Sequence, residues 1–197
     1  MKTIIRRLLI LASVIMIAFG AVYSCWYVRE MVPYQKIYRH MKEQAAADGA
    51  KIKESGRFLN VSLDPWCITL QKPQFPGKGS RLEVFEILQN HYIHDEKTGR
   101  SYMEQGKPDI RLIRYKPDKG KEFRLSLSVT DALPGENDFL NAPVMITGQG
   151  SLAEDVLDFG EMTDVYANRI DWILRTYHEQ ILEQIRFMEK MGGISVE

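Results

Sequence analysis

The densest group of potential metal ligands lies at residues 91–96, where two histidines and a Tyr-Ile pair precede two acidic residues. Imidazole and carboxylate groups together suit zinc and other divalent cations. His91 and His94 could share an ion on a helix, but on a strand they would point to opposite faces. We interpret the segment as a solvated strand end followed by a turn. A metal-dependent hydrolase that uses these histidines is the alternative.

Two further groups of charged residues could bind ions or partners. The acidic group falls near the start of a predicted helix, where the helix dipole stabilises carboxylates, and a divalent-ion or general-base role is the alternative. The basic group falls on one predicted hairpin, where it is either solvated or in contact with anionic headgroups or an acidic partner. The acidic group is Glu154, Asp155, Asp158, Glu161 and Asp164, and the basic group is Arg111, Arg114, Lys116, Lys119, Lys121 and Arg124.

Common catalytic motifs are missing from the sequence. It contains no G-x-S-x-G, H-E-x-x-H or C-x-x-C pattern, so it carries no signature of the usual serine-hydrolase, zinc-protease or dithiol sites. Residues 77–80, Gly-Lys-Gly-Ser, differ from a phosphate-binding loop, because Lys72 stands where that loop needs glycine and Gly79 follows the lysine. The sequence therefore favours a non-enzymatic protein, and no cofactor is expected.

One apolar stretch, residues 8–28, decides where the rest of the chain is placed. It contains no charged residue, and at about 1.5 Å per helical residue it matches the roughly 30 Å hydrocarbon thickness of a bilayer. Basic residues precede it, and aromatic rings that favour the headgroup zone lie at its other end. We predict a single-pass membrane anchor marked by Leu8, Phe19, Tyr23, Trp26 and Tyr27.

Two other interpretations of this stretch stay open. Residues 18–20, Ala-Phe-Gly, fit the cleavage site of a secretory signal, and residues 22–25 loosely resemble a bacterial lipobox that ends in Cys25. The apolar run continues through Val28, which favours an uncleaved anchor. The basic residues before the stretch favour a cytoplasmic N-terminus, although four more basic residues follow it between 29 and 42. All three interpretations place the following domain outside the cytoplasm.

The composition indicates a single domain without a disulfide framework. About 165 residues follow the anchor, enough for one hydrophobic core. Basic and acidic residues number 26 each, but residues 1–29 hold four basic residues and no acid, so the remainder has a net charge of −4. This negative balance argues against nucleic-acid binding. Cys25 and Cys67 lie far apart, and we interpret Cys67 as a buried small residue.

The pattern after the anchor predicts an α+β fold with an antiparallel sheet of about five to seven strands. Period-two alternation predicts strands, with the two clearest hairpins over 57–63 with 66–70 and over 110–115 with 123–130. Another strand is expected over 82–93, followed by a turn and a short strand at 101–103, and an edge strand at 143–147. Two prolines and two glycines make 72–80 an irregular surface loop.

Helical periodicity predicts two helices that pack on this sheet. The first is a juxtamembrane helix over 34–54, which Gly56 ends. The second is a C-terminal helical region within 152–191, which starts after a capping box at Ser151 and Glu154. Its long amphipathic part is expected over 163–191, and a break at Gly160 that leaves a shorter first helix is the alternative. The chain is thus divided into a tail and anchor (1–29), a juxtamembrane region (30–56) and an extracytoplasmic domain (57–197).

These features lead to three functional hypotheses. The leading one is a membrane-anchored, non-enzymatic binding or assembly component of a cell-envelope complex, with the membrane and a protein as partners. The second is a carrier of an apolar small molecule or lipid between the sheet and the C-terminal helix, for which a cavity of at least ~300 Å³ is expected. The third is the metal-dependent hydrolase described above.

Overall fold

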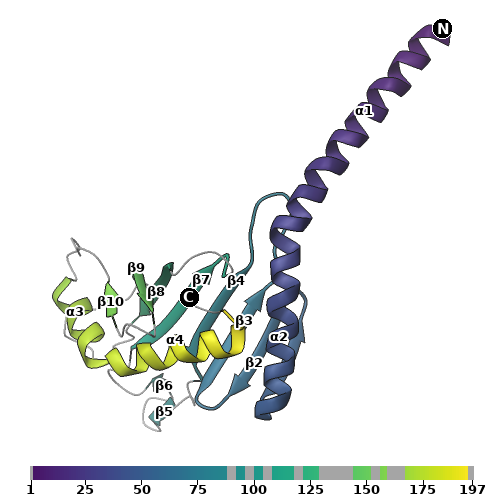
Figure 1. Cartoon of the computed structure of the whole chain (residues 1–197). Helices are drawn as coiled ribbons and strands as arrows, with labels where there is room; N and C mark the ends of the chain where they lie inside the picture. Colours follow the sequence, from purple (N-terminus) through teal and green to yellow (C-terminus); the bar gives the residue numbers. More distant parts are fainter. Residues whose placement is uncertain are drawn as a thin grey trace.

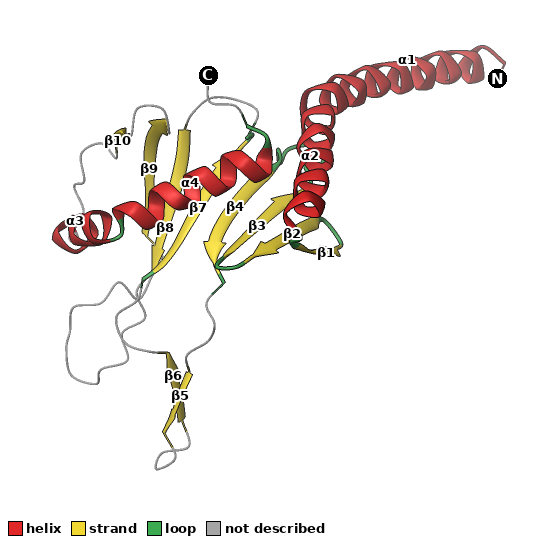
Figure 2. Cartoon of the chain, turned by 60° about the horizontal axis from the view of Figure 1, so that its bottom comes forward, coloured by secondary structure: helices red, strands yellow, loops and turns green. Residues whose placement is uncertain are grey.

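A long N-terminal helix projects from an α+β domain in the computed structural model of this chain (Figure 1). The structure describes residues 2–87, 92–95, 100–103, 108–117, 122–128, 144–151, 156–158 and 167–194. An antiparallel sheet forms one layer of the domain, and helices lie across one of its faces (Figure 2). The predicted α+β class is therefore confirmed.

Three helical segments follow one another without a loop: α1 (Lys2–Trp26), the π-helical turn η1 (Tyr27–Met31) and α2 (Val32–Asp48). Only Val32 separates the π turn from Pro33, which has no N–H to donate to the carbonyl group four residues back. The N–H of Val32 donates to the carbonyl of Tyr27, five residues back. This wider spacing lets one helical path continue past the proline and into the domain.

α1 exposes apolar side chains along its length, including Leu8, Ile15 and Phe19. The helical run Thr3–Asp48 contains a segment that is long and apolar enough to cross a membrane. A signal sequence near an N-terminus passes the same test. The structure therefore agrees with a membrane-directed segment at the predicted position.

The predicted juxtamembrane helix over 34–54 begins two residues early, at Val32, and is wrong at its C-terminal end. Helix α2 ends at Asp48 because Gly49 adopts a left-handed conformation, with φ 68°, and donates its N–H to the carbonyl of Ala45. Residues 51–55 form strand β1 instead, and Gly56, with φ 56°, lies in the turn to the next strand. Pairing with that strand provides hydrogen-bond partners for the backbone groups of residues 51–55, in place of the bonds that a longer helix would have made.

Among the described residues, the main sheet has eight antiparallel strands in the order β1-β2-β3-β4-β7-β8-β9-β10, which exceeds the predicted five to seven. A separate two-stranded sheet pairs β5 with β6. The strands are β1 (Lys51–Ser55), β2 (Phe58–Leu63), β3 (Trp66–Gln71), β4 (Arg81–Glu86), β5 (Tyr92–Asp95), β6 (Arg100–Met103), β7 (Asp109–Tyr115), β8 (Glu122–Ser128), β9 (Val144–Ser151) and β10 (Val156–Asp158).

Both clearly predicted hairpins are confirmed, as β2 with β3 and β7 with β8. Phe123, Leu125 and Leu127 are buried as their alternation predicts, whereas Val129 lies outside the described residues. The single strand expected over 82–93 is wrong, because β4 ends at Glu86 and β5 belongs to the small sheet. The short strand expected at 101–103 is present as part of β6.

The C-terminal helical region expected over 152–191 is also wrong in its first part. Ser151 ends β9, and β10 follows at Val156–Asp158, so sheet pairing takes the place of the expected helix start. Two helices come later, α3 (Ala167–Thr176) and α4 (His178–Gly192). Tyr177 separates them with φ −107° and ψ 21°, while hydrogen bonds still link it to Ile173 and Ile181.

The core lies between the sheet and the helices. α4 contacts β3, β4 and β7, and α2 contacts β1 and β2. Aliphatic residues at matching register positions of six strands form a row on this face: Val61, Ile68, Val84, Leu112, Leu125 and Ile146. Ile181, Ile185 and Met188 of α4 and Met41 of α2 belong to the same core. Apolar burial between the layers is therefore the main stabilising interaction.

Candidate functional site

An aromatic cluster joins α1 to the domain. This cluster, which we call the aromatic junction, consists of Phe19, Tyr23 and Trp26 on α1 and Phe75 in the loop between β3 and β4. The Phe75 ring centroid lies 5.7, 5.5 and 5.4 Å from those of the three α1 rings, in the order given. These distances and the edge-on orientation are favourable for aromatic pairs. Figure 1 shows the loop reaching up beside the helix.

The five predicted anchor residues differ in their surroundings. Leu8 and Phe19 are well exposed on α1, and Tyr23 is less exposed. Trp26 and Tyr27 are partly buried and pack against the core of the domain. The phenol oxygen of Tyr27 also accepts a hydrogen bond from Nε2 of Gln35 at 3.0 Å. The predicted anchor thus changes from exposed to domain-bound toward its C-terminal end.

The β3–β4 loop, residues 72–80, is closed by its own backbone. The N–H of Gln74 donates to the carbonyl of Lys78 at 2.7 Å, and the N–H of Lys78 donates back at 3.0 Å. Nη1 of Arg57, in the β1–β2 turn, donates to Oε1 of Gln74 at 2.6 Å. Gly79 passes so close to buried Glu30 that a Cβ there would lie 2.9 Å from a carboxylate oxygen. The loop therefore packs against α1 through Phe75 and against η1 through Gly79.

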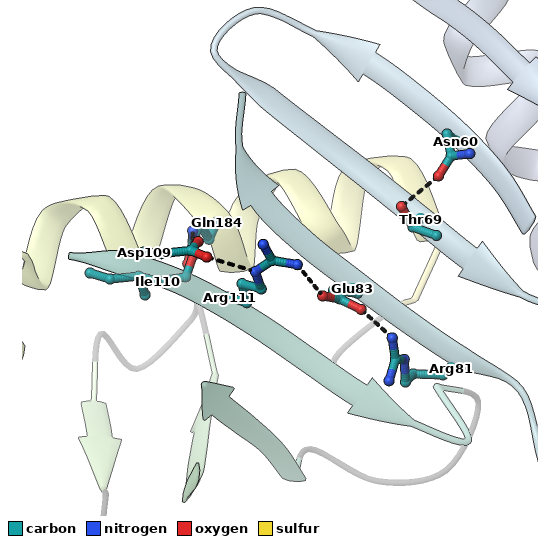
Figure 3. A network of polar contacts seen from close by, with 8 residues as sticks. All are labelled: Asn60, Thr69, Arg81, Glu83, Asp109, Ile110, Arg111 and Gln184. Atoms are coloured by element: carbon teal, nitrogen blue, oxygen red, sulfur yellow. Dashed lines mark hydrogen bonds and ion pairs between the residues drawn. The ribbon is translucent and has the colours of Figure 1, made fainter. Parts of the chain in front are cut away.

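The sheet face opposite α4 carries a chain of charged contacts (Figure 3). The carboxylate of Glu83 accepts hydrogen bonds from Arg81 and from Nη1 of Arg111, the latter at 3.4 Å. Nε of Arg111 also donates to Asp109 at 2.9 Å, and its guanidinium lies 5.2 Å from the Phe85 ring centroid. Burial lowers the pKa of Arg111, but the two carboxylates outweigh burial and raise that pKa overall. Arg111 is thus charged and held in place.

The predicted basic group does not form one surface. Arg111 and Arg124 lie on the face opposite α4, where the Arg124 guanidinium is 5.3 Å from the Tyr115 ring centroid. Arg114 lies on the other face and is buried. Positions 111 and 114 are an odd number apart on one strand, so their side chains take opposite faces. Lys119 lies outside the described residues.

Arg114 instead interacts electrostatically with Glu189 of α4. Burial lowers the pKa of Arg114, and Glu189 partly offsets this effect. Burial likewise raises the pKa of Glu189, and Arg114 partly offsets it. Among the described residues, Nε of Arg114 and Oε1 of Glu189 find no hydrogen-bond partner. The two groups therefore depend on each other's charge while lying on the covered side of the sheet.

A groove of about 450 Å³ lies between the start of α2 and the end of α4. Nε2 of His40 is 3.0 Å from the carbonyl oxygen of Lys190, and Nζ of Lys190 is 2.7 Å from Asp48. These contacts join the two helices beside the groove. The lining residues are Val32, Pro33, Lys36, Ile37, His40, Gly192, Gly193 and Ile194.

The candidate metal ligands at residues 91–96 lie only partly in the part of the chain that the structure describes. No group of three or more His, Cys, Asp or Glu side chains is placed there to hold a metal ion. His91 lies outside that part, and His94 belongs to β5. Of the acidic group, only Asp158 lies in a described element, β10. Cys25 and Cys67 are free thiols, and burial raises the pKa of Cys67.

Sequence reasoning missed the aromatic junction and the groove. It treated residues 72–80 only as a surface loop, although the segment places Phe75 just before Pro76 and between Lys72 and Lys78. An aromatic residue at the tip of a proline-containing, basic loop is a signal for an apolar contact surface. The groove has no such signal, because its two walls come from opposite ends of the chain.

No family model, curated protein or solved structure matches this chain. The function proposed below therefore rests on the geometry of the chain and on physical argument.

Proposed function

We propose that this chain is a single-pass, membrane-anchored binding or assembly component of a cell-envelope complex, with its α+β domain outside the cytoplasm and no catalytic role. The observation that carries the proposal is the helical path from α1 through η1 into α2. It links an exposed apolar helix directly to the domain core, through Trp26, Tyr34 and Ile37. Such a link suits a protein that must hold a folded domain close to a bilayer.

The same path favours an uncleaved anchor over the other two interpretations. A signal peptidase or a lipid-modifying enzyme would act at residues 18–20 or at Cys25, and both sites lie within α1. Cleavage after Gly20 would also remove Phe19 from the aromatic junction. The contacts that Trp26 and Tyr27 make with the domain give this end of the apolar stretch a structural role of its own.

The face of the sheet opposite α4 is the surface that we propose for protein contact. It combines paired charges with partly exposed apolar side chains, among them Phe58, Tyr115 and Met145. Aromatic, methionine and arginine side chains are enriched where proteins bind one another. Tyr115 also lines a hollow of about 320 Å³ with Ile113 and Arg124.

Site-specific photocrosslinking in the native host tests this proposal. A benzophenone amino acid at Tyr115 is expected to capture a discrete partner after mild detergent extraction. The matched control carries the same group at Glu183, an exposed position of α4. A monomer without crosslinks at Tyr115, Phe58 and Met145 would contradict the proposal.

The second candidate is a carrier of an apolar small molecule. One observation favours this candidate, but at a different site from the predicted space between the sheet and the C-terminal helix. The space between the sheet and α4 is filled by core side chains such as Ile68, Val84 and Ile185. The groove between α2 and α4 has a volume typical of small-molecule sites. Mass spectrometry of lipid extracts should then find a ligand that the groove-filling Val32→Trp variant lacks. An empty wild-type protein would end this candidate.

A further inference from the structure

The aromatic junction fixes how deep the β3–β4 loop lies relative to α1. Phe75 contacts rings from Phe19 to Trp26, so its ring lies near the level of Tyr23 along the helix axis. At about 1.5 Å per residue, Tyr23 is about 22 Å from Leu8, the first residue after the basic pair. A hydrocarbon layer roughly 30 Å thick that begins at Leu8 therefore extends about 7 Å beyond the level of Phe75.

The backbone and the tip of the loop suit a position inside the edge of the hydrocarbon layer. Backbone N–H and C=O groups need partners when water is scarce, and Gln74 and Lys78 pair theirs with each other. Pro73 and Pro76 have no N–H to leave unpaired. The tip between the paired residues is Phe75-Pro76-Gly77, which carries no charged side chain.

Basic side chains surround the loop where headgroups would lie. Arg57 is bonded to the loop, Lys72 and Lys78 belong to it, and Lys116 approaches Gly79. All four are exposed, as is Arg29 in η1, whereas Glu30 beside it is buried. Glu122 is an exposed acid at the start of β8. Each basic residue near an anionic bilayer surface contributes roughly 1 kcal/mol of attraction.

We propose that the β3–β4 loop is a second membrane contact, with Phe75 inserted at the outer edge of the hydrocarbon layer and the surrounding basic residues on anionic lipid headgroups. The inference rests on the proposed function, because it requires α1 to cross the bilayer. It adds that the domain lies against the membrane surface at this end instead of hanging from α1 alone.

Spin-label depth measurements on the full chain in vesicles of phosphatidylcholine and phosphatidylglycerol test the proposal. Cys25 is replaced by serine, and buried Cys67 is kept, with the chain lacking any added cysteine as the labelling blank. Single cysteines are placed at Gly77, where a Cβ meets nothing within 4 Å, at Ile15 in α1, and at Asp64 in the turn at the other end of β2 and β3. Accessibility to oxygen is compared with accessibility to a water-soluble nickel chelate.

The expected result is a several-fold higher oxygen-to-nickel ratio at Gly77 and Ile15 than at Asp64. A water-like ratio at Gly77 with a lipid-like ratio at Ile15 would overturn the loop contact and leave the anchor intact. A water-like ratio at Ile15 would overturn the anchor and, with it, the loop contact. The three positions therefore separate the two failures.

Two matched variants ask which side chains produce the contact. Phe75→Ser should move the label at Gly77 to a water-like ratio, whereas Phe58→Ser, which removes an exposed phenylalanine without a described contact to α1, should not. The double variant Lys72→Glu and Lys78→Glu should shift the label toward water in vesicles that contain phosphatidylglycerol. Equal effects of Phe75→Ser and Phe58→Ser would contradict a specific role for Phe75.

Discussion

The two faces of the main sheet carry alternate residues of the same strands, and they differ in burial, charge and polarity. On the face that the helices cover, the row from Val61 to Ile146 is aliphatic and buried. On the other face, Arg111 bonds Glu83 and Asp109, and Tyr115 and Met145 keep 47% and 46% of their surface exposed. Apolar burial stabilises the fold on one face, which leaves the other face free to vary in chemistry. We therefore expect stability to depend on the first face and partner binding on the second.

The largest expected effect on stability distinguishes two neighbouring residues of β8, Leu125 and Arg124. Leu125→Ala should lower the free energy of unfolding by about 2–5 kcal/mol, because it leaves a cavity in the core. Arg124→Ala, one residue earlier and on the other face, should cost less than about 1 kcal/mol. Urea unfolding of the full chain in detergent, followed by circular dichroism, compares them. Equal losses would contradict the division of roles between the faces.

A second comparison uses two arginines of β7 and depends on pH. Arg114→Met should destabilise the fold by about 2 kcal/mol at neutral pH, because Glu189 loses the positive charge that offsets its burial. The pKa of folded Glu189 lies above the ordinary 4.5, so its ionised form costs stability above that raised pKa. Lowering the pH through the raised pKa toward 4.5 should restore stability.

The controls for this pH effect are Arg111→Met and a double variant. Arg111→Met, on the opposite face, should show little loss at neutral pH, because its ion pairs are partly exposed. Adding Glu189→Gln to Arg114→Met should abolish the recovery on acidification. A loss that is the same at every pH would assign the effect of Arg114 to packing alone.

A third comparison asks how closely the covering helices must fit. Gly193 and Gly56 have nearly the same positive φ, 59° and 56°. Gly56→Ala should cost about 1 kcal/mol through backbone strain alone, since nothing lies within 4 Å of its Cβ. Gly193→Ala should cost at least about 2 kcal/mol, because its Cβ would lie 2.6 Å from the His40 ring. Thermal unfolding measures both, and equal costs would mean that the α2–α4 contact adapts.

The smallest expected effect lies on the exposed face. Asp109→Asn weakens the pair with Arg111 and should lower stability by less than about 1 kcal/mol. Salt should reduce the difference further, because it screens exposed charges. Thermal unfolding at low and high ionic strength checks this, and a loss comparable to that of Leu125→Ala would contradict it.

Local patterns predicted the parts of the fold that depend on neighbouring residues. Alternation placed Phe123, Leu125 and Leu127 on one buried face, and this face is observed. The pattern failed at 51–55, where Ile52 also fitted the helical face and only pairing with β2 selects a strand. It failed again at Ser151, where a good capping sequence lies at the end of β9, paired with β10. In both places, hydrogen bonds to the adjacent strand of the sheet outweighed the local helical preference.

In the candidate site, too, the sequence predicted the local features and missed the contacts between distant segments. Length and composition were enough to place an apolar segment at residues 8–28, because these properties are local. The contact of Phe75 with Phe19, Tyr23 and Trp26 joins segments about 50 residues apart, and no period or motif encodes such a distance. The placement of Arg114 under α4 likewise required the strand register, which Lys and Arg counts do not provide.

Because α1, η1 and α2 form one continuous helical path, the rotation of the domain about the α1 axis depends on the number of residues in that path. Each residue added to a helix turns everything beyond it by about 100° and shifts it by about 1.5 Å. One alanine inserted after Met31 would swing the β3–β4 loop around the axis and away from the stripe of α1 that carries Phe19. The number of residues between α1 and α2 therefore sets the rotation of the domain about the α1 axis, and in the proposed membrane-anchored protein it would set which flank of the domain faces a neighbour in the same bilayer.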